Sequence, residues 1–261
     1  MTTYLDRIIA HHRQRAVADN RSVANLVEAC QGLPATRGFQ QRLVNDSRAG
    51  LAVISEIKRR SPSKGDLAIG LDPVELARRY EEAGASCLSV LTDENFFAGS
   101  ASDLKAASEA TSLPVLRKDF TVSTADVCDA RLMGADCVLL IVAALTHDEL
   151  TSFAQIARDI GIDVLVEIHD ERELERALTI EPLMVGVNQR DLGTFQVDHD
   201  RAVRMAPQIP AGIIRVAESG VRGPDDARAL ADAGYHAVLV GEALVTASDP
   251  AAAVRALRAS C

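Results

Sequence analysis

The sequence predicts an α/β protein, a (β/α)₈ TIM barrel with an N-terminal helical extension. First, eight short apolar runs alternate with eight helical patterns over roughly 210 residues, which is the rhythm of such a barrel. Second, hydrophobic residues make up 48% of the chain but aromatic residues only 3%, which suits a parallel sheet that packs small aliphatic side chains against helices. Third, no Gly-x-Gly-x-x-Gly follows the first run, which disfavours the main alternative, a doubly wound open sheet.

The first fifty residues are predicted to form the helical extension. Residues 4–18 place apolar side chains on one side of a helix and basic side chains on the other. Ser22 is a candidate N-cap for a second helix that ends near Cys30, and residues 39–44 suggest a third. Because these apolar stripes have no strand to join, we expect the extension to lie against the barrel mouth and to help close a substrate site. Extension and barrel are expected to form one domain, residues 1–261.

The alternation begins after the extension. Val, Ile and Leu dominate the eight predicted strands, which are residues 51–57, 87–91, 115–116, 137–142, 164–168, 184–187, 213–217 and 237–240. The eight predicted helices are residues 73–83, 100–111, 124–133, 148–160, 171–179, 200–205, 224–233 and 250–258. Glycine follows several of these helices, as expected for a left-handed helix end.

Charge and cysteine content restrict the function. A net charge of −9 argues against a nucleic-acid or anionic-membrane partner. No apolar run reaches the roughly 20 residues needed to span a bilayer, and the N-terminal segment lacks a signal-peptide core. The five cysteines form no Cys-x-x-Cys pair and have no histidine at metal-ligand spacing, so we expect reduced thiols and no metal site. These features predict a cytoplasmic protein and leave its protein partners and oligomeric state open.

One stretch departs from the pattern of a buried core. Residues 54–65 read ISEIKRRSPSKG, in which Glu56 and Lys58 are two positions apart and therefore share one face of a strand. The following Ser-Pro-Ser-Lys-Gly is a loop by its composition. In an acidic chain, such a local group of cations predicts the rim of an anion-binding active site. The alternative is a solvated strand end with a chance ion pair.

Charged residues recur at the carboxyl ends of the other predicted strands, which meet at one mouth of a barrel. Two lysines and three glutamates are costly to bury there unless they are paired, so the set favours a catalytic site over separate structural salt bridges. His169, which follows Glu167, is expected to face away from the barrel interior. The charged set is Glu56, Lys58, Lys118, Glu167 and Glu218.

Two further features indicate what this mouth binds. Phe97 and Phe120 follow the second and third predicted strands, and flat apolar walls can hold an aromatic ring. Gly220 and Gly241 begin the loops after the last two strands, where backbone N–H groups can bind phosphate. Because Glu242 comes next, we expect the backbone to hold phosphate there, without help from a side-chain hydroxyl.

At these residues the chain resembles the indole-3-glycerol-phosphate synthase family. The matching segments cover every predicted barrel strand except the last. They are SEIKRRSPSKG at 55–65, LTDE at 91–94, LRKDF at 116–120, LLIV at 139–142, VEIH at 166–169, NQRDL at 188–192 and AESGV at 217–221. The first, third and last of these segments are the most specific.

The resemblance implies a lyase of tryptophan biosynthesis that acts without a cofactor. Its substrate would be 1-(2-carboxyphenylamino)-1-deoxyribulose 5-phosphate, which is decarboxylated, closed to an indole and dehydrated. Lys118 would be the general acid at the carbonyl oxygen, Glu167 would serve dehydration, and Arg190 would meet the anthranilate carboxylate. The assignment of acid and base among the lysines and glutamates stays open. The implied catalytic set is Lys118, Glu167, Lys58, Glu56, Asn188, Glu218 and Ser219, and the implied substrate-binding set is Ser61, Phe97, Phe120, Leu139, Arg190, Gly220 and Gly241.

Two rival functions share parts of this pattern. In a Schiff-base lyase, Lys118 or Lys58 would attack a ketose phosphate, but that chemistry does not explain the Glu56/Lys58 pair or the aromatic walls. A non-catalytic barrel that only binds a sugar phosphate would use Gly220 and Gly241, and it would need no glutamates at the mouth.

Overall fold

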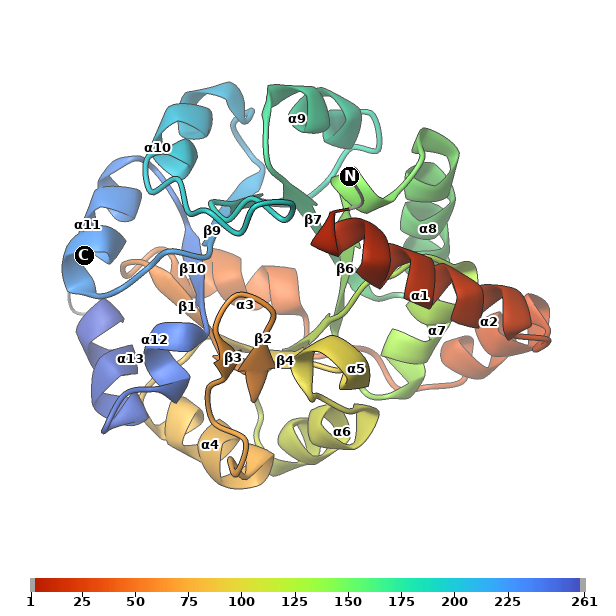
Figure 1. Ribbon diagram of the computed structural model, residues 1–261, viewed down its shortest axis with the longest axis horizontal. Helices are drawn as coiled ribbons and strands as arrows, with labels where there is room; N and C mark the ends of the chain where they lie inside the picture. The colour runs from red at the N-terminus through yellow and green to blue at the C-terminus, as the bar shows by residue number, and fades with distance from the viewer. Residues whose placement is uncertain (1–2, 259–261) are drawn as a thin grey trace.

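The computed structural model describes residues 3–258, which form a closed barrel of eight parallel strands (Figure 1). Around the barrel the strand order is β1-β10-β9-β8-β7-β6-β5-β4. The strands are β1 (Ala52–Ile57), β4 (Cys87–Leu91), β5 (Val115–Lys118), β6 (Cys137–Ile141), β7 (Asp163–Ile168), β8 (Met184–Asn188), β9 (Ile214–Glu218) and β10 (Ala237–Val240). All eight predicted strands are confirmed, and the fold class is the predicted (β/α)₈ barrel.

One strand is longer than its apolar run indicates. β5 continues through Arg117 and Lys118, which pair in parallel register with Val90 and Leu91 of β4. The sequence prediction ended this strand at Leu116 because charged residues follow. The backbone pairing with β4 outweighs the low strand preference of these charged residues, and it fixes the backbone of Lys118 within the strand.

The helices that cover the barrel also match their predicted positions to within one residue at each end. Five of them begin at an Asp, Ser or Thr whose side chain accepts hydrogen bonds from the first turn. The helices are α4 (Pro73–Glu82), α6 (Ala101–Ala110), α7 (Thr124–Leu132), α8 (His147–Asp159), α9 (Glu171–Leu178), α10 (Arg201–Met205), α11 (Pro224–Asp232) and α13 (Pro250–Arg258).

Several short elements were not predicted because they are too short to show a hydrophobic period. Five of them lie in the loops that follow barrel strands. They are the two-stranded hairpin of β2 (Arg60–Ser61) and β3 (Gly65–Asp66), α5 (Glu94–Phe97), the 3₁₀ turn η1 (Val142–Ala144) and α12 (Glu242–Val245). A second 3₁₀ turn, η2 (Ala206–Gln208), follows α10.

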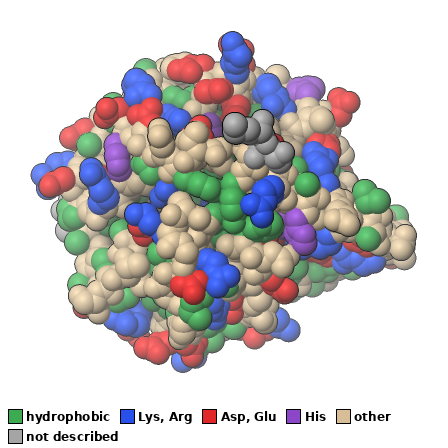
Figure 2. Space-filling view, in the orientation of Figure 1, with side chains coloured by type: hydrophobic (Ala, Val, Ile, Leu, Met, Phe, Trp, Pro, Cys, Tyr) green, Lys and Arg blue, Asp and Glu red, His purple; other side chains and the backbone are tan. Residues whose placement is uncertain are grey.

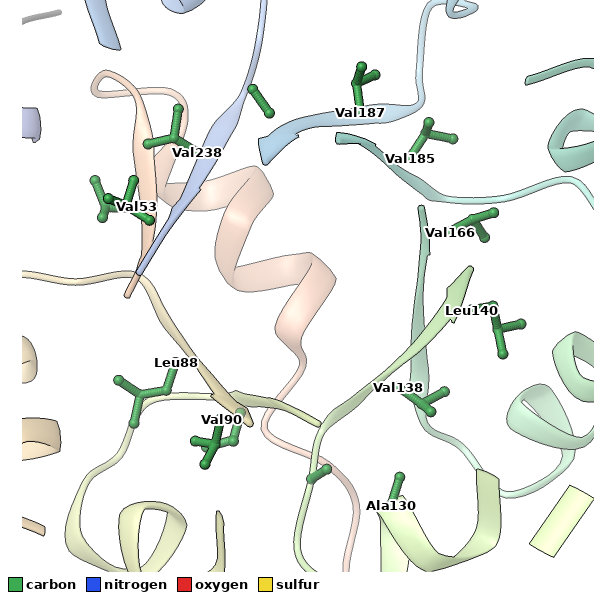
Figure 3. Close-up of a cluster of buried hydrophobic side chains, with 14 of the residues drawn as sticks. Val53, Leu88, Val90, Ala130, Val138, Leu140, Val166, Val185, Val187 and Val238 are labelled. Atoms are coloured by element: carbon green, nitrogen blue, oxygen red, sulfur yellow. The ribbon is translucent and has the colours of Figure 1, made fainter. Parts of the chain in front are cut away.

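The core has two layers. Outward-facing side chains such as Val53, Leu88, Val138 and Val166 are buried between the strands and the surrounding helices, as Figure 3 shows. A second layer fills the barrel itself and is built from residues of the opposite strand face, including Leu139. The four cysteines among the described residues are buried and unpaired, and Cys261 lies outside the described residues.

The extension forms the three predicted helices, α1 (Tyr4–Ala18), α2 (Val23–Gln31) and α3 (Phe39–Asp46). α1 lies at the mouth of the barrel, and its Leu5 and Ile8 line the cavity there. α2 packs outside the barrel against α7. The prediction that the whole extension covers the mouth is therefore right only for α1. Among the described residues, no helix combines the length and apolar character needed to cross a bilayer.

α3 closes the opposite end of the barrel. In Figure 1 it lies behind the strands, whereas α1 and the β2–β3 hairpin lie in front of them. Phe39 and Leu43 are fully buried in one cluster with Ala52 and Cys87, which are the first residues of β1 and β4. The sequence prediction missed this plug because a strand pattern does not indicate which apolar helix fills the lower opening.

Candidate active site

The carboxyl ends of the strands surround one cavity of about 880 Å³. Figure 2 shows this face of the molecule, with hydrophobic side chains and Lys or Arg side chains meeting near its centre. All fourteen residues of the predicted catalytic and substrate-binding sets line this cavity. All eight barrel strands contribute to this set, either directly or through the loops that follow them, as the strand-end rule predicted.

Lys118 lies among carboxylates at the centre of the cavity. Its Nζ donates a hydrogen bond to Glu167 Oε2 at 3.0 Å and lies 3.5 Å from Glu218 Oε2. Asn188 Nδ2 donates to the other oxygen of Glu167 at 2.9 Å, and Asn188 Oδ1 accepts from the Arg190 backbone N–H at 3.0 Å. Glu167 is thus held from two sides, and its carboxylate has one fixed orientation.

Glu56 and Lys58 form a second ion pair at the end of β1. Lys58 Nζ donates to Glu56 Oε1 at 2.7 Å, and Ser89 Oγ donates to Oε2 at 3.2 Å. Gly241 faces this pair, and a Cβ at that position would collide with the Glu56 carboxylate and come within 2.9 Å of Lys58 Nζ. Glycine at the end of β10 therefore leaves the space that the pair occupies.

Three carboxyl groups, those of Glu56, Glu167 and Glu218, share the ammonium groups of Lys58 and Lys118. Burial, followed by the charge of Glu167, raises the pKa of Glu218 to about 8. Burial also opposes ionisation of Glu167, but the charges of Lys118 and His169 outweigh it and lower the pKa of Glu167. Near neutral pH, Glu218 is accordingly the protonated carboxyl group and Glu167 is the carboxylate.

The neighbouring glutamates keep Lys118 charged. Burial alone would lower the pKa of this lysine, but its acidic neighbours, Glu167 first, outweigh burial, and its pKa is raised. An ammonium group that is held in this way can donate a proton or stabilise a developing oxyanion. It is poorly suited to act as a neutral amine nucleophile.

Two phenylalanines form an apolar wall beside the lysines. Phe97 ends α5, Phe120 follows β5, and their ring centroids are 6.2 Å apart at an interplanar angle of 40°. Leu139 of β6 lines the same cavity from inside the barrel. These surfaces provide room for a planar ring next to the charged groups.

The loops after β9 and β10 form the opposite side of the cavity. Ser219 and Gly220 both have positive φ, at 64° and 74°, and a Cβ at Gly220 would lie 2.7 Å from Val197 Cγ1. Gly241 precedes α12 and has no side chain to cap it. Ser61 lies in the β2–β3 hairpin and also lines the cavity.

Glu242 bridges the cations at this side of the cavity. Its carboxylate lies 3.7 Å from Lys64 Nζ and 3.6 Å from Arg190 Nη2. The Glu242 side chain is 38% exposed, so both contacts are weak and can open to admit an anionic group.

The sequence prediction missed a buried polar cluster between α1 and the strand ends, formed by His12, Asp93 and Asp119. Arg15 Nη2 donates to His12 Nδ1, which leaves Nε2–H to donate to Asp93 Oδ2 at 2.8 Å. Asp93 also accepts from the backbone N–H groups of Phe96 and Phe97, so it fixes the turn that carries one aromatic wall.

Asp119 fixes the second wall in the same way. It accepts from the Phe120 backbone N–H and from the Arg117 side chain, each at 2.8 Å, and it lies 3.7 Å from His12 Nε2. His12, Asp93 and Asp119 could each offer one ligand atom to a cation, but their polar atoms are already engaged with neighbouring donors. The positions of Asp93 and Asp119 at strand ends were a signal for this group, whereas nothing in the sequence singled out His12, which is buried on the same face of α1 as Ile8.

The prediction for His169 is wrong. Residues 167 and 169 are two positions apart, so they lie on the same side of the chain. His169 Nε2 lies 3.5 Å from Glu167 Oε1 instead of facing away from the barrel interior.

A closed barrel whose mouth carries paired lysines and glutamates defines an enzyme of the (β/α)₈-barrel class. Residues 5–257 match the family described as indole-3-glycerol phosphate synthase. The chain is 47% identical over 251 residues to the indole-3-glycerol phosphate synthase of Nocardioides sp., covering 96% of each chain. It is 48% identical over 254 residues to that of Mycolicibacterium vanbaalenii, covering 97% of this chain and 92% of the relative. The chain belongs to the indole-3-glycerol phosphate synthase family, which comprises carboxy-lyases of tryptophan biosynthesis.

Solved structures with much lower sequence identity share the architecture. A 3-hexulose-6-phosphate synthase superimposes with a TM-score of 0.63 at 18% identity, covering 80% of this chain and 99% of that one. A thiamine phosphate pyrophosphorylase from Pyrococcus furiosus gives a TM-score of 0.61 at 17% identity, covering 82% of this chain and 96% of that one. At such identities the likeness shows the fold alone.

Proposed function

We propose that this chain converts 1-(2-carboxyphenylamino)-1-deoxyribulose 5-phosphate to indole-3-glycerol phosphate without a cofactor. The observation that carries the proposal is the position of Lys118, a charged ammonium group held by Glu167 and Glu218 beside an apolar wall. Family membership supports the reaction. Membership in a family of tryptophan biosynthesis supports a cytoplasmic location, and the glycine loops after β9 and β10 support a phosphorylated small molecule as the ligand.

The cavity offers a separate surface for each part of this substrate. The anthranilate ring fits against Phe97 and Phe120, and its carboxylate is within the reach of Arg190 once Glu242 moves aside. The phosphate fits the loops after β9 and β10, where Gly220 and Gly241 expose their backbone. This orientation places the ribulose carbonyl near the lysines in the middle of the cavity.

The chemistry then divides into two stages. In the first, the anthranilate ring carbon that bears the carboxylate attacks the ribulose C2 carbonyl, Lys118 gives its proton to the carbonyl oxygen, and carbon dioxide leaves. In the second, the new hydroxyl departs as water and the indole forms. Glu167 serves this dehydration, while Glu56, Asn188, Glu218 and Ser219 position the lysines and the substrate hydroxyls. Lys58 holds anionic substrate or donates a second proton.

The test is direct turnover of the synthetic substrate. Protein mixed with the anthranilate-ribulose phosphate is expected to produce indole fluorescence and one equivalent of carbon dioxide for each indole. A barrel that only binds sugar phosphates would bind the substrate and release neither product. That outcome would refute the proposed activity.

Borohydride distinguishes the Schiff-base rival. Because its acidic neighbours, Glu167 first, keep Lys118 protonated, we expect borohydride added during turnover to leave the protein mass unchanged. A covalent adduct at Lys118 or Lys58 in the mass spectrum would show that the reaction proceeds through an imine and not by acid catalysis.

A further inference from the structure

His169 lies at the junction between β7 and α9, directly behind Glu167. Glu173 Oε2 accepts hydrogen bonds from both the backbone N–H of His169, at 2.8 Å, and the ring Nδ1, at 3.0 Å. This carboxylate oxygen can only accept, so Nδ1 carries a proton. The ring is thereby fixed with Nε2 pointing toward the active site.

The other ring nitrogen has an unusual environment. His169 Nε2 is buried and has no hydrogen-bond partner at normal distance among the described residues, while Glu167 Oε1 lies 3.5 Å away. If the ring were neutral, its Nε2 lone pair would face a carboxylate oxygen across a dry gap, which is electrostatically unfavourable. A proton on Nε2 turns this contact into a charge-assisted attraction.

We propose that His169 is a positioning residue for the reaction: Glu173 holds its ring so that a protonated Nε2 faces Glu167 and fixes the charge and orientation of that carboxylate. His169 itself makes and breaks no bond in the substrate. Its protonated ring stabilises the Glu167 carboxylate whenever that group has given up a proton. The inference rests on the proposed role of Glu167 in the reaction.

The surroundings of the ring support this charge state. Burial opposes protonation of His169, but the hydrogen bond to Glu173 and the charge of Glu167 outweigh burial and raise its pKa. Arg201 of α10 acts in the opposite direction, and Lys118 competes for the same glutamate. Two carboxylates therefore face the ring from β7 and α9, against one arginine from α10.

The charge of the ring can be measured without substrate. Long-range ¹H–¹⁵N NMR spectra of the intact protein report the protonation of each histidine ring, and the His169 signals are identified by their loss in His169→Asn. We expect the His169 ring to titrate above the ordinary histidine value of 6.5, so that it is mostly doubly protonated at pH 6. Glu173→Gln and Glu167→Gln should each lower that midpoint. The matched control Glu175→Gln, on the exposed side of α9, should leave it unchanged.

Kinetics supply the functional part of the test. Glu173→Gln should lower kcat about 10- to 100-fold with little change in KM, as expected from weakening one hydrogen bond to a charged group. Glu175→Gln should keep wild-type kinetics. A His169 midpoint at or below 6.5, or equal midpoints in all variants, would overturn the proposal even if the enzyme turns over normally. A failure of wild-type turnover would refute the proposed function and leave the charge measurement intact.

Discussion

At the scale of single residues, the main feature of the barrel mouth is its set of buried charged side chains. Three buried glutamates face two lysines, and the carboxyl group of Glu218 is the one whose oxygens accept no hydrogen bond from the described residues. Its nearest cation, Lys118, is shared with Glu167 at a shorter distance. Glu218 therefore takes up a proton near neutral pH, because no cation of its own offsets its burial.

The raised pKa of Glu218 predicts a pH-dependent change in stability. The folded state holds this proton up to about pH 8, whereas the unfolded chain releases it near the ordinary value of 4.5. The resulting stabilisation is complete below pH 4.5 and is lost as the pH rises through 8. Glu218→Gln does not titrate, so its Tm relative to wild type should rise between pH 5 and pH 9.

Calorimetry measures this difference, and about 2–4 °C is expected for each kcal/mol in a chain of this size. Glu175→Gln, an exposed glutamate on α9, is the control and should follow wild type at every pH. A constant Tm difference between Glu218→Gln and wild type across this range would show that Glu218 is ionised throughout.

The phosphate loop gives a second prediction at this scale. Gly220 has φ +74° and no room for a Cβ, so Gly220→Val displaces the loop that is proposed to hold phosphate. KM should rise far more than kcat falls, because the loop binds substrate and transition state alike. Gly212→Val is a matched control, since Gly212 also has positive φ, at 91°, but no atoms within 4 Å of a Cβ. If Gly220→Val folds and keeps its KM, phosphate binds elsewhere.

At the scale of elements, prediction succeeded where an element was long enough to show its period. The eight strands and the eight long helices follow from apolar runs, helix caps and glycine ends. β2, β3, α5 and α12 are each two to four residues long, so no period indicates them. Their shape depends on partners distant in sequence: His12 reaches from α1 to Asp93, the cap of α5.

α1 is therefore predicted to organise the mouth as well as cover it. Deleting residues 1–20 removes Leu5, Ile8 and His12 but leaves α3 in place at the opposite end. Circular dichroism should remain typical of a barrel, while KM rises because the turn that carries Phe97 loses its anchor. Arg21→Ala in the full-length chain is the control, because it removes only the ion pairs of a half-exposed arginine with Asp19 and Asp129. Full activity after the deletion would make α1 a surface appendage.

At the scale of the whole molecule, the extension secures both ends of the barrel. Its first helix narrows the catalytic mouth, and its third helix inserts Phe39 and Leu43 beneath the strands. The sequence predicted three helices correctly but placed all of them at the mouth. Apolar stripes show that a helix must be buried, whereas the shape of the barrel decides which opening it fills.

The shape of the barrel also explains why the positions of the site residues could be predicted from the sequence. Parallel strands all end at one mouth, so charged residues at strand ends must converge, and the structure brings the fourteen predicted residues to one cavity. Their charge states did not follow from sequence, because they depend on distances between side chains of different strands. The predicted orientation of His169 was wrong because residues 167 and 169, two positions apart, lie on the same side of an extended chain. In the structure the His169 ring lies beside Glu167.

The central claim is that Lys118 donates the proton that starts ring closure. The most direct measurement is single-turnover release of carbon dioxide by Lys118→Met, with Lys105→Met on the exposed surface of α6 as control. We expect the rate to fall by about 10²–10⁴-fold in Lys118→Met, the loss typical of a positioned acid, while a non-reactive reduced analogue of the substrate still binds. Lys105→Met should match wild type. Wild-type carbon dioxide release by a folded Lys118→Met protein would contradict the account.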